Sequence, residues 1–193
     1  MTTHEPTRSV VDALRSNPGS ELMRRIALID AEDYTGIARK VAADLAALHN
    51  GEVPNPTYVD TGIFALKQYY VVALVDPANA HAISSPLDPF WHAHILHSEA
   101  YMRFCDRVIG EYMHHVPLDH DTPSQVQNVR TLYDFTLERL AQLFWDVDRE
   151  FWPSSVSDAE LICYHKGSYD IYPEVQTLRL FEPCPEGTAH AFA

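Results

Sequence analysis

Residues Tyr58 to Val75 read Y-V-D-T-G-I-F-A-L-K-Q-Y-Y-V-V-A-L-V and carry a charged or amide side chain only at Asp60, Lys67 and Gln68. A helix that is apolar on nearly all of its faces is buried on nearly all of them. Residues 54–56, Pro-Asn-Pro, precede this segment, and Asp-Pro follows it at 76–77. We therefore expect a helix here that forms the centre of the fold.

Helical patterns also surround this segment. Residues 31–48 place apolar side chains three to four apart, with Asp30 positioned to cap the start of that helix. Asp88-Pro89 resembles a helix start and predicts a helix to about Ile109, before Gly110. Capping boxes at 122–125 and 157–160 predict a helix to about residue 144 and a shorter one ending before Gly167.

Together these patterns predict an all-α fold, a helical bundle of about five to six helices in one domain spanning residues 1–193. Its motif core covers residues 58–121. The stretch from about 169 to 193 contains three prolines and no clear periodicity, so we expect it to be an extended tail.

The composition narrows the range of partners. The chain has 193 residues, 46% of them hydrophobic, which suits a globular domain, and its net charge is −13. This acidity argues against nucleic acid and anionic membranes, which recruit basic patches. Neither a signal peptide nor a membrane span is evident, so we expect a cytoplasmic protein. The partner that we expect is a small-molecule substrate. The oligomeric state stays open.

Histidines are concentrated in one part of the chain. Six of the eleven lie between Asp88 and Asp121, in D-P-F-W-H-A-H-I-L-H and in the later H-H-V-P-L-D-H-D. Neutral imidazole is the commonest metal ligand and the usual proton shuttle near neutral pH. This density predicts a functional site.

Helical geometry separates these histidines. At about 100° per residue, His94, Tyr101 and Cys105 share one broad apolar face, whereas His92 points away from it. His94 and Tyr101 are therefore candidate catalytic residues in an interior pocket. The alternative for His94 is a core histidine hydrogen-bonded to a tyrosine or a carbonyl group.

A metal centre would need ligands from more than one segment. We expect a divalent metal, iron, zinc or copper, held by a selection from His92 or His94, His114 or His115, and Asp88 or Asp119. Asp88 has two readings, a helix cap and a carboxylate that orients or joins His92.

The last predicted helix contains two further candidates. His165 and Cys163 lie near its end and could approach the centre. A histidine that interacts favourably with the helix dipole is the better supported reading of His165.

Three functions remain open. The first is a metal-dependent small-molecule enzyme, either an oxidoreductase or a hydrolase or lyase, in specialised metabolism. The second is a non-catalytic helical interaction module with a structural zinc site or a buried His/Tyr polar network. The third is metal-free acid–base catalysis by a His94–Tyr101 pair.

The core also carries a family resemblance. The run K-Q-Y-Y-V-V-A-L from Lys67, then L-D-P-F-W-H-A-H-I-L, Tyr101, Cys105, Gly110 and H-H-V-P resemble the glycine-rich domain-containing protein-like family. The matching positions are Asp88, Trp91, His92, His94, Tyr101, Cys105, Gly110, His114 and His115. The chain has no glycine-rich region, and plant members of that family are similar to signalling or RNA-associated proteins.

Overall fold

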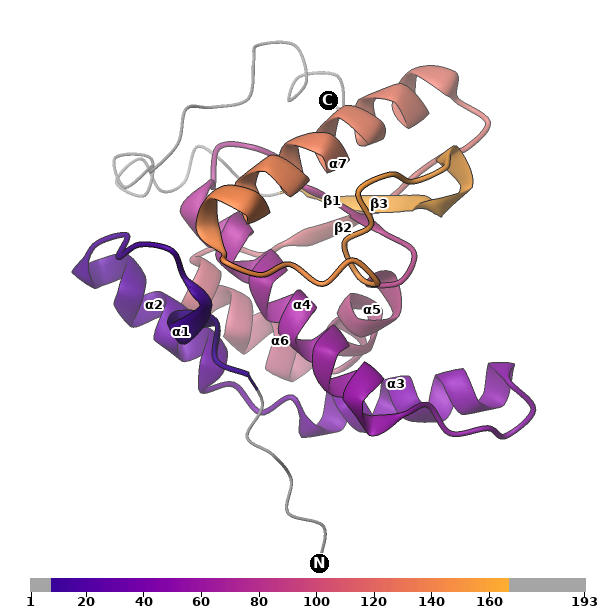
Figure 1. The fold of residues 1–193 in the computed structure, drawn as a ribbon, viewed down its shortest axis with the longest axis horizontal. Helices are drawn as coiled ribbons and strands as arrows, with labels where there is room; N and C mark the ends of the chain where they lie inside the picture. Colours follow the sequence, from indigo (N-terminus) through magenta and orange to yellow (C-terminus); the bar gives the residue numbers. More distant parts are fainter. Residues whose placement is uncertain (1–7, 167–193) are drawn as a thin grey trace, which may run out of the picture.

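The centre of the fold is helix α4 (Pro56–Val75), as predicted. The computed structural model describes residues 8–166, and Figure 1 shows α4 running through the middle of them. Every residue from Gly62 to Val75 is buried. Asn55 caps the helix by accepting from the Thr57 N–H, and Pro56 occupies the first helical position. Helices α2, α5 and α7 all pack on it.

Within the described residues, three helices precede α4. They are α1 (Val10–Ala13), α2 (Ser20–Asp30) and α3 (Thr35–Leu48). Asp30, predicted to cap α3, instead ends α2, and its carboxylate accepts hydrogen bonds from the Val10 and Val11 N–H groups. It also forms an ion pair with the buried Lys67 of α4 at 3.1 Å. One carboxylate therefore connects α1, α2 and α4.

The all-α prediction is wrong, because the fold includes a three-stranded antiparallel sheet. Its strands are β1 (Ala82–Ser84), β2 (His114–Pro117) and β3 (Leu161–Lys166), in the order β1-β3-β2. The sequence indicated a loop at β1, another at β2, and a helix at β3. In place of the predicted helix there is only the short 3₁₀ turn η2 (Asp158–Glu160), where the Glu160 carboxylate accepts a hydrogen bond from the Ser157 N–H. A three-residue strand leaves almost no periodic signal, and β3 finds its partners far away in the chain.

The helix predicted for 88–109 is divided into three parts. These are α5 (Asp88–Leu96), α6 (Ser98–Phe104) and the π-helix η1 (Cys105–Ile109). At the break, the His97 ring nitrogen Nδ1 lies 2.7 Å from the Ala93 carbonyl oxygen, which a helix would pair with the His97 backbone N–H. That N–H bonds to His94 instead. Gly110, with φ of 92°, ends η1 as predicted.

Helix α7 (Pro123–Leu143) covers β1 and β3, and α5 packs on both α3 and α4. The contact between α4 and α5 is close. A Cβ added to Gly62 would lie 2.1 Å from Cζ of Phe90, so only glycine allows this approach. No helix in residues 8–166 combines the length and hydrophobicity needed to cross a bilayer. The predicted tail at 169–193 lies outside the described residues.

Candidate metal centre

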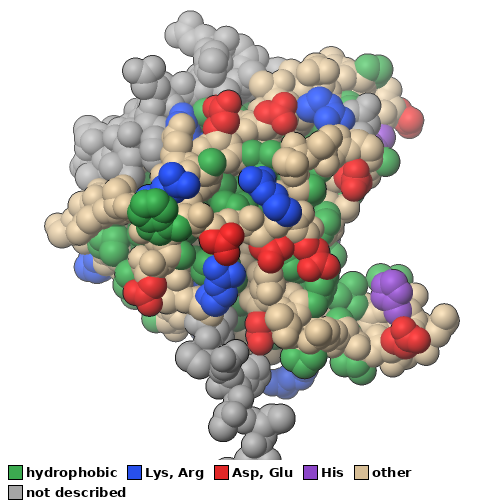
Figure 2. Space-filling view, in the orientation of Figure 1, with side chains coloured by type: hydrophobic (Ala, Val, Ile, Leu, Met, Phe, Trp, Pro, Cys, Tyr) green, Lys and Arg blue, Asp and Glu red, His purple; other side chains and the backbone are tan. Residues whose placement is uncertain are grey.

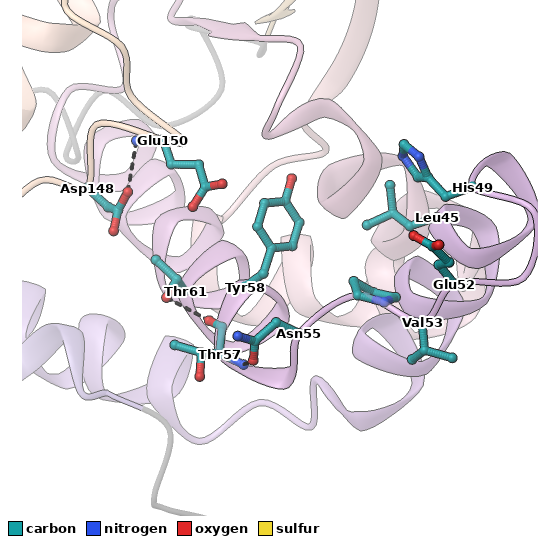
Figure 3. Close-up of a pocket in the computed structure, with 11 residues that line it drawn as sticks. Leu45, His49, Glu52, Val53, Asn55, Thr57, Tyr58, Thr61, Asp148 and Glu150 are labelled. Carbon is teal, nitrogen blue, oxygen red and sulfur yellow. Dashed lines mark hydrogen bonds between the residues drawn. The ribbon is translucent and has the colours of Figure 1, made fainter.

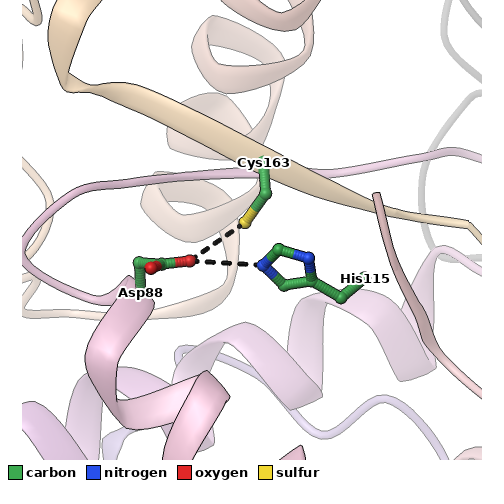
Figure 4. Close-up of side chains that lie close together, drawn as sticks. All are labelled: Asp88, His115 and Cys163. Atoms are coloured by element: carbon green, nitrogen blue, oxygen red, sulfur yellow. Dashed lines mark hydrogen bonds and ion pairs between the residues drawn. The ribbon is translucent and has the colours of Figure 1, made fainter. Parts of the chain in front are cut away.

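The first residue of α5 is the hub of the candidate site. Of the two readings of Asp88, the helix cap is wrong, because Leu87 holds the capping position and Asp88 makes no capping bond. Its carboxylate points instead toward the sheet (Figure 4). Oδ1 of Asp88 lies 3.3 Å from Nε2 of His115 and 3.4 Å from Sγ of Cys163. Three segments that are distant in sequence meet at this oxygen.

The sheet delivers the two other side chains. His115 lies on β2, where it pairs with His165 of β3. Cys163 lies on β3, the middle strand, between Ile83 of β1 and Pro117 of β2. A residue on the middle strand is held by backbone pairing on both sides, so the thiol position is fixed. The site therefore exists only because the sheet forms.

The distances resemble those of a tetrahedral metal site. One ligand atom from each of Asp88, His115 and Cys163 lies within 4.8 Å of the other two. With metal–ligand bonds of about 2.0 to 2.3 Å, tetrahedral geometry separates N from O by about 3.4 Å and S from O by about 3.6 Å. Two of the three separations in the cluster, 3.3 Å from Oδ1 of Asp88 to Nε2 of His115 and 3.4 Å from the same oxygen to Sγ of Cys163, are close to these values.

The electrostatics of the thiol argue against covalent catalysis. Burial and the adjacent Asp88 carboxylate raise the pKa of Cys163 well above its usual value. A nucleophilic cysteine needs the opposite, a lowered pKa and an accessible sulfur. In a Cys–His–Asp triad the histidine also stands between thiol and carboxylate, whereas here Asp88 contacts both others. A divalent cation would compensate two adjacent anionic ligands.

His92 lies on the exposed side of this cluster. Its Nδ1 is 3.1 Å from Oδ2 of Asp88, one helical turn away, and its side chain is 47% exposed, against 15% for Asp88 and for His115. The rings of His92 and His115 lie 4.4 Å apart between centroids. His92 therefore occupies the border between the cluster and solvent.

The structure does not bring the other predicted ligands to this cluster. His114 is exposed and packs against Tyr112, because neighbouring residues of a strand face opposite sides. Asp119 follows β2 and binds Thr122 at the start of α7. Neither belongs to the group of ligand atoms around Asp88.

His94 and Tyr101 are buried, as the helical pattern predicted. His94 forms a hydrogen bond to the Tyr70 hydroxyl, with Nδ1 and Oη 2.7 Å apart. Burial, followed by the charge of His97, lowers the pKa of His94 to about 3, so the ring is neutral. The Tyr101 hydroxyl accepts a hydrogen bond from the Trp91 indole N–H and donates one to the Met113 carbonyl oxygen. A buried His/Tyr network is thus present in this part of the fold.

Two features of the site region were not identified from sequence. The first is the strand that carries Cys163: the sequence named this cysteine as one that could approach the centre but placed it at a helix end, although the β-branched and aromatic composition of residues 161–164 was a signal for a strand. A second buried network was also missed. In it, Asp76 forms an ion pair with Arg139 at 3.1 Å and lies 3.5 Å from Nε2 of His81, and the His165 ring forms a hydrogen bond with Tyr69.

A cleft lies apart from the cluster, between the C-terminal end of α3 and the body of the protein (Figures 2 and 3). Its volume is about 680 Å³, and the Tyr58 hydroxyl projects into it next to Glu150. Burial, then Glu150, raises the pKa of Tyr58. The lining has three carboxylates, no lysine and no arginine, and its residues are Leu45, His49, Glu52, Val53, Pro54, Asn55, Thr57, Tyr58, Thr61, Asp148 and Glu150.

The fold and the site define a class of protein, a mainly helical domain with a three-stranded antiparallel sheet and an Asp–His–Cys cluster between a helix and that sheet. Within this class, the chain belongs to the UCP032817-like family, whose model matches residues 36–139. The match runs from α3 through most of α7. It includes Asp88, His92 and His115, and it ends before Cys163. No curated protein and no solved structure matches the chain significantly.

Proposed function

We propose that this protein is a metal-dependent enzyme for a small-molecule substrate, with zinc or iron bound by Asp88, His115 and Cys163. The observation that supports this proposal is the convergence of three different ligand types from α5, β2 and β3, with their ligand atoms within 4.8 Å of one another. The resemblance to the glycine-rich domain-containing protein-like family covers Asp88 and His115 and is compatible with a shared site.

The ligand set favours particular metals. A thiolate, an imidazole and a carboxylate together suit zinc, while iron(II) is the next candidate and copper the third. Three protein ligands leave one position for water or substrate, which is the arrangement of catalytic zinc sites. A metal bound there would polarise a substrate carbonyl or activate a water molecule.

His92 lies in a position to act on a water molecule or substrate bound at the open coordination position. Its partial exposure places it where a substrate would arrive, and its contact with Asp88 fixes one ring nitrogen. In this position a histidine can transfer protons to or from a bound molecule. The same position would also allow it to become a fourth ligand.

Metal binding provides the first test. The full-length protein is purified without added metal, analysed for zinc and iron, and titrated with Zn²⁺ after chelation. We expect one equivalent of metal, and we expect Cys163→Ala and His115→Ala to weaken zinc binding by at least about 100-fold, since each removes one ligand.

The chain offers a matched control for this test. His114→Ala removes the exposed histidine next to His115. It should bind zinc as the unmodified protein does. Equal affinity of the His115 and His114 variants, or no zinc binding by the unmodified protein, would contradict the proposal.

The alternative is a non-catalytic module in which His92 completes a closed structural zinc site. The observation in its favour is the 3.1 Å contact of His92 with Asp88, next to the His115 ring. Cobalt(II) substitution distinguishes the two. An open cobalt site binds azide, and its visible spectrum changes, whereas the spectrum of a closed four-ligand site is not altered by azide. In the closed site His92 is a ligand, so His92→Ala should also weaken metal binding.

A further inference from the structure

We infer that Tyr101 is a positioning residue for the metal centre, acting with Trp91 to hold His115 in place. This inference rests on the proposed metal site. Tyr101 does not contact the cluster of ligand atoms, so its role would be to fix the strand that carries one of them.

The Tyr101 hydroxyl connects α5 to the start of β2. It accepts a hydrogen bond from Nε1 of Trp91 at 3.0 Å and donates one to the carbonyl oxygen of Met113 at 2.8 Å. All three residues are buried, with at most 1% of their surface exposed. Met113 directly precedes β2, and His115 is the second residue of that strand. The hydroxyl thereby fixes the backbone two residues before the ligand.

Trp91 reaches His115 by a second route. Its ring lies 4.9 Å from the His115 ring between centroids, inclined by 45°. Trp91 is also three residues after Asp88 on the same helix. The contacts therefore form a closed circuit, from Asp88 along α5 to Trp91, through Tyr101 to Met113, and along β2 to His115. Such a circuit limits how far the two ligands Asp88 and His115 can move apart.

Tyr70 is a matched comparison within the same core. It is buried, it lies on α4, and its hydroxyl also forms a short hydrogen bond, to Nδ1 of His94 at 2.7 Å. That hydrogen bond reaches α5 at His94, six residues after Asp88, but it does not reach β2 or the Met113 carbonyl group. Tyr70→Phe should therefore remove a comparable buried hydrogen bond without moving His115, and it controls for a general loss of stability.

The experiment measures zinc affinity of the full chain by competition with a chromophoric chelator. We expect Tyr101→Phe to weaken zinc binding by about 10-fold, the lower end of the effect of removing a hydrogen-bond partner of a metal ligand, because Tyr101 acts on His115 through the backbone of Met113. Tyr70→Phe should stay within about twofold of the unmodified protein. The cobalt(II) spectrum of Tyr101→Phe should also shift, since the imidazole loses its fixed orientation.

The outcomes separate the two proposals. If the unmodified protein binds zinc and Tyr101→Phe binds it equally well, the positioning role is refuted while the metal site stands. If the unmodified protein binds no metal, both proposals fall. If Tyr101→Phe fails to fold, Trp91→Phe is measured in its place, because it removes the indole N–H that donates to the Tyr101 hydroxyl and the ring that packs on His115. Unchanged zinc affinity there would refute the circuit through Trp91 and Tyr101.

Discussion

Mild acidification should destabilise this protein through histidines that are held neutral in its core. Burial, with a contribution from His97, lowers the pKa of His94 to about 3, and burial, followed by the charge of His81, lowers that of His165 to about 3. In the unfolded chain both return to about 6.5. Above that pH the two states bind the same number of protons. As the pH falls below it, only the unfolded state gains a proton, so stability decreases until the folded pKa is reached.

The size of the effect follows from this linkage. Between about pH 7 and pH 5.5, each such histidine reduces the free energy of unfolding by about 1.3 kcal/mol, and the pair by about 2.5 kcal/mol. The amount scarcely depends on the folded pKa, because a value of 3 or of 4 leaves the folded ring neutral at pH 5.5. Most carboxylates remain ionised in this interval, which therefore isolates the histidines.

Urea unfolding followed by circular dichroism at the two pH values measures the loss, with chelator present to remove bound metal. His94→Asn keeps a hydrogen-bonding group near Tyr70 but cannot titrate. Between pH 7 and pH 5.5, the decrease in the free energy of unfolding should be about 1.3 kcal/mol smaller in this variant than in the unmodified protein. The comparison within each protein cancels the cost of the substitution itself. His114→Asn, at an exposed position, is the control and should retain the full pH dependence.

If His94→Asn loses as much stability on acidification as the unmodified protein does, His94 is not held neutral by its surroundings. The argument from burial would then be refuted at this residue. A loss in the unmodified protein well below 1 kcal/mol would refute it for both histidines.

Three further predictions concern packing, charge and thiol chemistry. Gly62→Ala should destabilise the protein by about 1–3 kcal/mol in urea unfolding, because the new Cβ would overlap the buried Phe90 ring; an unchanged midpoint would contradict this close approach. Asp30→Ala should lower the free energy of unfolding by about 3–5 kcal/mol, since it leaves the buried Lys67 unpaired, whereas Lys67→Met should lower it much less. Equal losses of stability in urea unfolding would contradict the ion-pair argument. Cys105 should resist iodoacetamide in the native protein and react after unfolding, as measured by mass spectrometry, because burial raises its pKa to about 11; rapid native labelling would show that it is accessible.

The helical part of the fold could be predicted because its signals are local. The apolar run of α4, the proline and cap at its start, and the face shared by His94, Tyr101 and Cys105 all depend on neighbours within a few turns. The break at His97 was missed, since it depends on a side chain competing for the Ala93 carbonyl. Such competition leaves no mark on the apolar periodicity.

The sheet and the candidate site could not be predicted in the same way. A strand as short as β1 has no measurable period, and Leu161–Lys166 follows a capping box that indicated a helix. Without the sheet, the approach of Cys163 to the centre stayed one option among several, and the two readings of Asp88 could not be separated. The capping interpretation was locally reasonable, but the carboxylate is directed toward the sheet.

The sequence alone thus determined the central helix, the inward face of α5 and α6, and the segments in which the site residues lie. Only the tertiary structure decided that His115 rather than His114 faces Asp88, and that Cys163 completes the cluster. The physical reason is that helix formation depends on residues within a few turns. The pairing of β3 with β1 and β2 instead depends on register between distant segments, and a shift of one residue would turn each side chain to the opposite face.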